Sequence, residues 1–534
     1  MPVSNPILPG FFPDPSCIKV GSYFYLANSS FQFFPGIPIH KSKDLVNWTH
    51  IELLGNVLCR PSQLNLNQAT TRNTPSRNEI FTGGLFAPTI RYHKATFYIF
   101  CTNLYLKPQD APDGDYFPQN FFITSTNLQD PSSFSDPILY EFYGIDPSVY
   151  FDLDDRVYVQ GSFLFGYDRS IQATTISQAE IDIKTGKLLS PIQELWKGHS
   201  GVIPEGPHIY RKDGYYYLLV AEGGTFDGHM LTIARAKNSI WGPYEPCPHN
   251  PVIRANNTVC PLIQRVGHGE LVYDDITDTW WALVLATRSG GRSRFPLGRE
   301  TFLTSVEWPD GDWPQFTAIE ENLKVRPPLL EVKVASRQLD QKVLLGDPKT
   351  IFLRTPKLTD YRQDDDKLLL KPTEENLSLQ EGTMTFLGQR QYQLSSHASV
   401  VLLLADLDVS KRKSLRAGIT VYKDTNRHCS LFLEIMITGE IAIAFEVEAI
   451  DVTAPQRLAS VFLPQSHEAI SLTIIATPEK YEFFYSRQND KEKEKLGEAD
   501  GSVLTGNDFT GAVYAIFASG SWDDSVAFRG FVTG

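Results

Sequence analysis

Three carboxylate residues stand in short motifs that can carry acid–base chemistry. They are Asp14 in Phe-Pro-Asp-Pro-Ser, Asp146 in Ile-Asp-Pro-Ser and Glu205 in Pro-Glu-Gly-Pro. Two carboxyl groups can hydrolyse a glycosidic bond when one protonates the leaving oxygen and the other activates water or attacks the sugar. The acid needs a pKa raised by burial or by nearby negative charge, and the apolar surround of Glu205 suits that role. The alternative is structural, because Asp-Pro-Ser is also an ordinary turn sequence.

These motifs belong to a repeat that occurs five times in the first 320 residues. Each copy has a leading motif, a strand, a tight turn and an aromatic strand, and the leading positions are 14, 87, 146, 205 and 268. This spacing fits a four-stranded sheet with long loops, and five such sheets predict a five-bladed β-propeller. We expect residues of one repeat phase to meet at one end of the central channel. That phase holds the three carboxylates, together with Ala87 and His268.

The rest of the chain predicts a second domain. The repeat stops near residue 322, and residues 323–345 form a predicted linker. Residues 346–534 contain alternating strands typical of a β-sandwich, as in 399–404 and 417–422. The predicted fold class is therefore all-β, with a propeller domain at 1–322 followed by a sandwich domain.

Composition and charge limit the kinds of partner and the location that this protein can have. A net charge of −13 without a long basic stretch argues against nucleic acid. No run approaches the roughly 18 apolar residues that a membrane span needs. The six cysteines are scattered, which indicates reduced thiols. The first residues lack a signal-peptide pattern, which predicts a cytoplasmic protein, or a secreted one if a leader has been removed.

The same motifs resemble glycoside hydrolase family 43, in its β-xylosidase and α-L-arabinofuranosidase branch. The similarity runs through residues 5–16, 31–48, 86–88, 145–148 and 205–208, and it continues through 221–225, 267–268 and 296–301. It covers the predicted propeller, and residues 509–515 resemble the sandwich of the same branch. The resemblance implies a five-bladed propeller and inversion at the anomeric carbon.

The resemblance also implies roles for single residues. By residue match, Asp14 is the general base, Asp146 modulates the pKa and orients the acid, and Glu205 is the general acid. The residues matched to substrate contacts are Phe31, Phe86, Arg299, His268 and Phe509. Phe509 would reach over the pocket from the sandwich and make the enzyme exo-acting. No cofactor is required and no metal ligand is assigned, although a structural calcium ion near His268 is an alternative.

Three functions remain open at this point. The first is an inverting exo-hydrolase that releases xylose from β-1,4-xylo-oligosaccharides, with or without action on α-L-arabinofuranosyl residues of arabinoxylan-derived substrates. The second is an endo-arabinanase, and the third is a non-catalytic carbohydrate-binding propeller. The family branch also implies a homo-oligomer.

Overall fold

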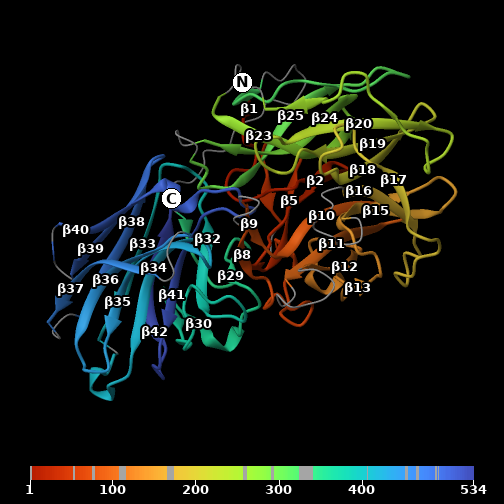
Figure 1. Cartoon of the computed structure of the whole chain (residues 1–534). Helices are drawn as coiled ribbons and strands as arrows, with labels where there is room; N and C mark the ends of the chain where they lie inside the picture. Colours follow the sequence, from red (N-terminus) through yellow and green to blue (C-terminus); the bar gives the residue numbers. More distant parts are fainter. Residues whose placement is uncertain are drawn as a thin grey trace.

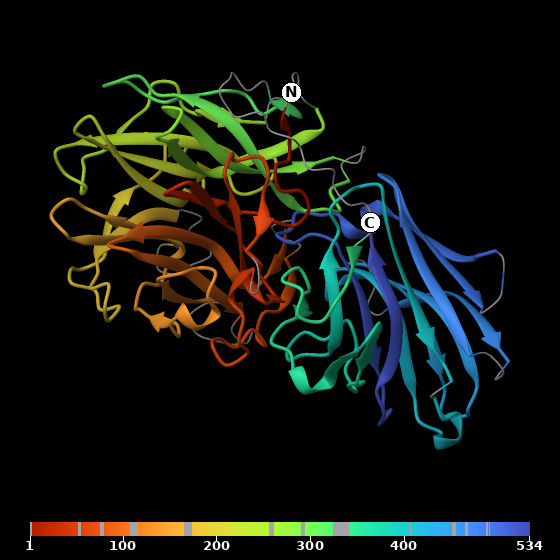
Figure 2. The same ribbon diagram turned by 180° about the vertical axis from the view of Figure 1, so that it is seen from behind.

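Strands dominate the computed structural model, which describes residues 3–51, 55–74, 79–106, 116–164, 174–255, 261–289, 294–323, 341–405, 407–450, 455–464, 468–487, 490 and 492–534. Among these residues the helical elements are short 3₁₀ turns at Pro131–Ser133, Leu358–Asp360, Val409–Lys411 and Gly501–Leu504. The predicted all-β class is confirmed. An N-terminal body, coloured red to green, lies beside a C-terminal body, coloured cyan to blue (Figures 1 and 2).

The N-terminal body contains five antiparallel sheets, one for each copy of the repeat. The first holds β2 (Ser16–Val20), β3 (Tyr23–Ala27), β5 (Gly36–Ser42), β6 (Thr49–His50) and β7 (Asn56–Leu58). The second holds β10 (Gly84–His93), β11 (Thr96–Leu106), β12 (Tyr116–Ser125) and β13 (Ile138–Leu139). The third holds β14 (Ile145–Phe151), β15 (Val157–Leu164), β16 (Thr174–Glu180) and β17 (Gln193–Trp196).

The last two sheets complete this body. The fourth holds β18 (Glu205–Lys212), β19 (Tyr215–Glu222), β20 (Met230–Lys237), β21 (Glu245–Pro246) and β22 (Ile253–Arg254). The fifth holds β23 (Ile263–Asp274), β24 (Thr279–Arg288), β25 (Arg299–Glu307) and β26 (Gln315–Phe316). The first strands touch in a closed circuit, because β2 contacts β10 and β23, β14 contacts β10 and β18, and β18 contacts β23.

Three two-stranded pairings complete the N-terminal body and join it to the C-terminal body. They are β1 (Val3–Ser4) with β27 (Asn322–Leu323), β8 (Thr71–Thr74) with β9 (Glu79–Thr82), and β4 (Phe33–Phe34) with β29 (Phe352–Leu353). The last of these crosses between the two bodies. The two bodies approach each other closely at Gly298, where an added Cβ would lie 2.4 Å from the Thr510 carbonyl oxygen.

The C-terminal body is a β-sandwich, as the strand pattern predicted. One sheet holds β28 (Gln341–Lys342), β30 (Tyr361–Asp364), β31 (Lys367–Leu370), β33 (Ser396–Leu403), β38 (Ala469–Ala476), β39 (Lys480–Arg487), β40 (Glu494–Asp500) and β42 (Val526–Thr533). The other holds β32 (Thr385–Arg390), β34 (Leu415–Asp424), β35 (Arg427–Ile435), β36 (Ile441–Glu448), β37 (Gln456–Leu463) and β41 (Val513–Ser519). Alternate residues such as Val400, Leu402, Ile419 and Val421 are buried in one shared core.

The predicted linker at 323–345 lies mostly outside the described residues, which omit 324–340. Its last residues form β28, which pairs with β42 of the sandwich. No helix among the described residues has the length and apolar character to cross a bilayer. The five cysteines within the described ranges are free thiols.

Candidate active site

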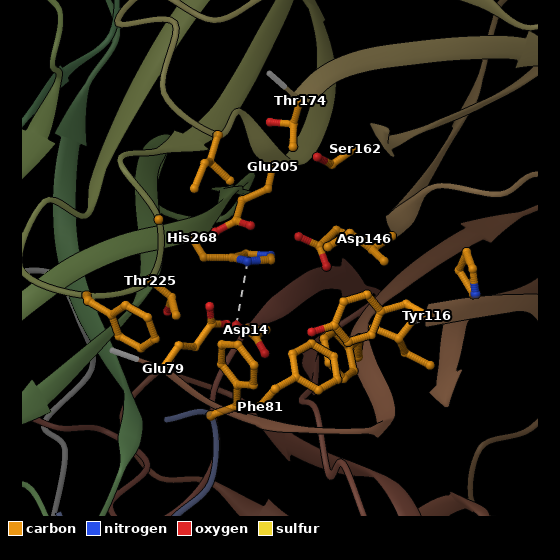
Figure 3. A pocket seen from close by; sticks show the side chains of 18 of the residues that line it. Asp14, Glu79, Phe81, Tyr116, Asp146, Ser162, Thr174, Glu205, Thr225 and His268 are labelled. Carbon is orange, nitrogen blue, oxygen red and sulfur yellow. Dashed lines mark ion pairs between the residues drawn. The ribbon is translucent and has the colours of Figure 1, made fainter. Parts of the chain in front are cut away.

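One pocket of about 400 Å³ lies where the five sheets meet the sandwich (Figure 3). The structure brings all the sequence-predicted site residues into its lining: Asp14, Phe31, Phe86, Asp146, Glu205, His268, Arg299 and Phe509. This volume lies within the range of small-molecule sites, which is about 300–1,000 Å³. The pocket is therefore large enough for a small-molecule ligand, and the three predicted carboxylates line it.

An irregular stretch of backbone near the start of each sheet places the leading motif of each repeat at the pocket. The register slips in β10, β14, β18 and β23 at this point. The backbone enters the left-handed region at Asp14, Ala87, Asp146, Gly206 and His268, with φ between 26° and 56°. Left-handed backbone is strained for a residue other than glycine and is concentrated at functional sites.

The phase expected for Glu205 is wrong by one residue. Gly206, not Glu205, holds the left-handed position, and Glu205 is equivalent to Ile145 in the register of the sheets. A Cβ at Gly206 would also lie 2.8 Å from the His268 ring, so both conformation and space require glycine there. Glu205 reaches the pocket from the position before the bulge.

Asp14 is held by donors from two sides. The Ser29 hydroxyl donates to its Oδ2 at 2.6 Å, and the Arg299 guanidinium donates to its Oδ1 at 3.1 Å. Ser29 itself accepts from the Ala87 amide at 2.7 Å. Nδ1 of His268 lies 3.5 Å from Asp14 Oδ1. These contacts fix the orientation of a carboxylate that is 4% exposed.

Asp146 is linked electrostatically to both other carboxylates, because the charge of Asp14 acts on its pKa and its own charge acts on the pKa of Glu205. Burial raises the pKa of Asp146 to about 6, and the charge of Asp14 adds to that rise while His268 opposes it. The Gly206 amide donates to Asp146 Oδ2 at 3.1 Å. That bond ties Asp146 to the residue that follows Glu205.

Glu205 has the character of a proton donor. Burial raises its pKa well above the usual range, and the negative charges of Asp146 and Asp14 raise it further. The preceding carbonyl, of Pro204, accepts from Ser162 at 2.7 Å and from Thr174 at 3.3 Å. The raised pKa favours the protonated form of Glu205, and hydrogen bonds to the Pro204 carbonyl hold the backbone that carries it.

Arg299 joins the carboxylates to the sandwich. Besides binding Asp14, it donates to the Thr225 hydroxyl at 3.0 Å and to the Phe509 carbonyl at 3.2 Å. Its guanidinium lies 5.3 Å from the centre of the Phe31 ring and 5.5 Å from that of Phe509. One side chain therefore contacts both bodies at the pocket.

Phe509 closes one wall of the pocket from the sandwich. Its ring stacks on Phe31 at 5.9 Å and on Phe226 at 6.1 Å, and it meets Phe81 and Phe86 edge to face. Such aromatic pairs stabilise beyond the area they bury. The wall combines residues from strands and loops that are far apart in the sequence.

A buried group of charges anchors the segment that carries Phe509. Asp508, 5% exposed, accepts from Arg427 at 2.5 Å and lies 3.0 Å from the Lys423 ammonium. Asp424 pairs with Arg427 from the other side. Burial lowers the pKa of Lys423 to about 8, although Asp508 opposes that shift.

Beneath the pocket, a polar network fills the space between the first strands. The Glu270 carboxylate accepts from Ser16 at 2.9 Å and from Arg91 at 2.8 Å. Arg91 also contacts His208 at 3.1 Å. Each of these side chains lies a few positions after a pocket residue in the sequence. They therefore brace the strands that carry the pocket residues.

Among the described residues, no group of three or more His, Cys, Asp or Glu side chains is placed to hold a metal ion. At His268 the acidic neighbour within ion-pair distance is Asp14, whose oxygens already accept from Ser29 and Arg299. Calcium takes about six to eight oxygen ligands. The residues at His268 therefore do not fit the calcium ion considered from the sequence.

Several lining residues were not found from the sequence. Glu79, Phe81, Tyr116 and Phe226 all line the pocket. Each lies outside the leading motif of the repeat, so the repeat gave no signal for them. Thr225 belongs to the 221–225 motif, but its contact with Arg299 is visible only in the structure.

Hydrolysis of a glycosidic bond requires a proton donor with a raised pKa beside a second carboxylate, and Glu205 and Asp14 provide that arrangement in this pocket. Fold and site together therefore define an enzyme of this class. The family model described as Glycosyl hydrolases family 43 matches residues 3–314. The model described as Beta xylosidase C-terminal Concanavalin A-like domain matches residues 347–528. The chain belongs to glycosyl hydrolases family 43.

Relatives match almost the whole chain. The non-reducing end alpha-L-arabinofuranosidase BoGH43B of Bacteroides ovatus is 33% identical, over 97% of this chain and 91% of that protein. The beta-xylosidase of Bacillus subtilis is 28% identical, over 96% of this chain and 95% of that protein. The structure of a xylan beta-1,4-xylosidase from Bacillus halodurans has a TM-score of 0.86 at 26% identity and covers 99% of both chains.

Replacing Asp508 by Asn should destabilise the protein strongly. The substitution removes the charge facing Lys423 and Arg427 at constant volume, and breaking a buried pair costs about 3–5 kcal/mol. The free energy of unfolding in urea measures this loss, and KM should rise because Phe509 is the next residue. Asp500→Asn, which breaks a more exposed pair with Arg294, should have a much smaller effect. Equal losses would contradict the anchoring role.

Replacing Asp146 by Asn should move the pH profile. The charge of Asp146 helps raise the pKa of Glu205, so its removal lowers that pKa. A general acid works only while protonated, and the alkaline limb of kcat/KM should therefore shift to lower pH. Steady-state rates across pH 5–9 measure the shift. An alkaline limb that stays in place or moves upward would contradict this electrostatic link.

Proposed function

We propose that this chain is an inverting exo-glycoside hydrolase that releases xylose from the non-reducing ends of β-1,4-xylo-oligosaccharides and also acts on α-L-arabinofuranosyl residues. The observation that carries the proposal is one pocket whose lining includes Asp14, Asp146 and Glu205. Full-length relatives named arabinofuranosidase and beta-xylosidase support both pentoses. Both sugars offer similar hydroxyl groups to one pocket.

The proposed reaction is a single displacement. Asp14 takes a proton from a water molecule as the water oxygen bonds to the anomeric carbon. Glu205 gives its proton to the leaving oxygen as the glycosidic bond breaks, so one proton is taken and one is given. Asp146 keeps the Glu205 carboxyl protonated, and Arg299 binds sugar hydroxyls beside Asp14.

We also propose that the five sheets are the blades of a five-bladed β-propeller. The closed circuit of contacts among the first strands supports it, as does the pairing of β1 with β27, which joins the two ends of the N-terminal body. In a propeller the first strands surround the central axis. The pocket would then lie at one end of that axis.

Exo action follows from the shape of the pocket. Phe509 from the sandwich walls one side of the pocket by stacking on Phe31, and we infer that the far end does not admit a longer chain. A chain of sugars could enter only by its end. An endo-arabinanase needs an open groove along which a sugar chain can bind, so the proposed pocket shape disfavours that function.

Assembly is a further part of the proposal. We infer a homo-oligomer, as the family resemblance implies. Leu458 and Phe462 on strand β37, at the edge of its sheet, are 57% and 63% exposed. Exposed apolar side chains on an edge strand favour association.

The anomer released from xylobiose tests the main proposal. Proton NMR of the fresh product should show α-xylose first, because a single displacement inverts the β linkage. The same spectra identify the monosaccharide, and arabinofuranosides are tested in parallel. Initial β-xylose would mean retention, with Asp14 as a nucleophile. Larger fragments in place of single sugars would indicate an endo-acting enzyme.

Metal removal should leave the activity unchanged. The surroundings of His268 offer a cation too few ligands, and every proposed step uses protein side chains. Hydrolysis rates before and after dialysis against EDTA measure this, with added Ca²⁺ as the matched control. A loss that Ca²⁺ restores would contradict the proposal and favour a structural calcium ion.

A further inference from the structure

Glu222 is a fully buried carboxylate that none of the proposed catalytic steps uses. It is the last residue of β19, and its exposed fraction is 0%. A buried carboxylate is costly unless hydrogen bonds satisfy its oxygens. Oε1 accepts from the His199 amide at 2.7 Å and from the Thr232 hydroxyl, and Oε2 accepts from the Ser200 amide at 2.7 Å and from the Ser200 hydroxyl. Together these donors fill the roughly four acceptor positions of a carboxylate.

Most of these donors belong to one exposed loop. Residues 197–204 connect β17 to β18 and end immediately before the proposed acid, Glu205. Residues 199–202 are exposed, so burial of apolar surface contributes little to holding the loop in place. The Gly223 amide adds a bond of 2.8 Å to the Val202 carbonyl. Hydrogen bonds to the end of β19 therefore anchor this loop.

The constraint extends along the loop to the acid. Gly198 has a φ of 86°, and an added Cβ there would lie 2.9 Å from Glu222 Oε2, so both conformation and space require glycine. Ile203 lines the pocket with a φ of 45°, a left-handed backbone that is an outlier for a β-branched residue. Such backbone persists when its surroundings hold it, and the bonds to Glu222 and Gly223 hold the residues before Ile203. Glu205 follows two residues later, as the first residue of β18.

Strand β19 also brings the anchoring carboxylate close to the acid. Glu205 pairs with Ala221 across the sheet, and Glu222 is the next residue of that strand. The chain continues from Glu222 into Gly223 and Gly224, which line the pocket. One strand end therefore supports both the loop before the acid and part of the pocket wall.

We propose that Glu222 is a positioning residue that fixes the loop before Glu205 and thereby holds the general acid against the leaving oxygen. The inference rests on the proposed function and deepens it. It explains why a carboxylate buried beside the pocket gives its oxygens to the amides of an exposed loop. Glu222 itself contacts neither the substrate nor the reacting atoms.

Glu222→Gln tests this role at nearly constant volume. Each oxygen of Glu222 accepts from one backbone amide of the loop, at His199 or at Ser200. Whichever way the glutamine amide turns, its NH₂ group therefore meets one of these amides and cannot accept from it. The loop loses an anchoring bond in both orientations. A displaced acid slows the reactions that need proton donation and spares those that do not.

Two xylosides with different leaving groups measure the displacement. Xylobiose has a sugar leaving group that must be protonated, whereas dinitrophenyl β-xyloside releases a stable anion. Glu222→Gln should lower kcat/KM for xylobiose about 10–100-fold, because misplacing a catalytic group by about 1 Å can cost that much. For dinitrophenyl β-xyloside the loss should stay within about 3-fold. A series of aryl β-xylosides should show a steeper dependence of the rate on the pKa of the released phenol.

Controls separate positioning from general destabilisation. Thr232→Val removes the donor to Glu222 that lies outside the loop, and it should leave the dependence on the leaving group unchanged. Ser200→Ala removes one donor of the loop. It should give the same selective loss in smaller measure, and it replaces Glu222→Gln in the test if that variant does not fold.

The ratio of the two losses decides the outcome. A loop variant that loses the same factor on both xylosides, or loses activity on neither, would overturn the proposal, because a merely structural carboxylate does not distinguish leaving groups. Failure of the unmodified enzyme on both xylosides would instead overturn the proposed function.

Discussion

The ion pair between Arg299 and Asp14 is the interaction on which the site depends. Three carboxylates lie buried in one pocket, where burial and nearby negative charge oppose the charged forms of Asp146 and Glu205. Arg299 supplies a compensating positive charge to Asp14 through a direct ion pair, and its charge offsets only part of the rise in the pKa of Asp146 and Glu205. The same guanidinium holds the Phe509 carbonyl. One side chain therefore contributes both to the charge balance of the pocket and to the junction between the two bodies.

A repeated backbone constraint makes this arrangement possible. Left-handed residues at the start of the sheets turn successive motifs toward one point, and Asp14, Asp146 and His268 take that conformation without being glycine. Such backbone is costly unless its surroundings hold it. The contacts of Asp14 with Ser29 and of Asp146 with the Gly206 amide supply part of that support. Strain and function thus coincide at the same residues.

Much of the fold was predictable because the repeat is local. Alternating strands and turn residues predicted the all-β class and the sandwich, and the leading motifs pointed to Asp14 and Asp146. Glu205 was predicted as a pocket residue and lies in the pocket, but the repeat phase assigned to it was wrong, because Gly206 holds that position. Only the register of β18 against β19 shows the offset, because a bulge leaves no unambiguous mark in the sequence.

The sequence by itself determined which residues could do the chemistry, since carboxylates in recurring turn motifs depend only on short-range patterns. The tertiary structure alone decided what surrounds them. Glu79 on β9 and Phe226 in a loop lie outside the repeat motifs, and the segment that carries Phe509 is held by the buried charges of Lys423 and Asp508. The ring contacts of Phe509 with Phe31 and Phe226 join residues that are hundreds of positions apart. No local pattern encodes these contacts, because they arise only when the two bodies pack together.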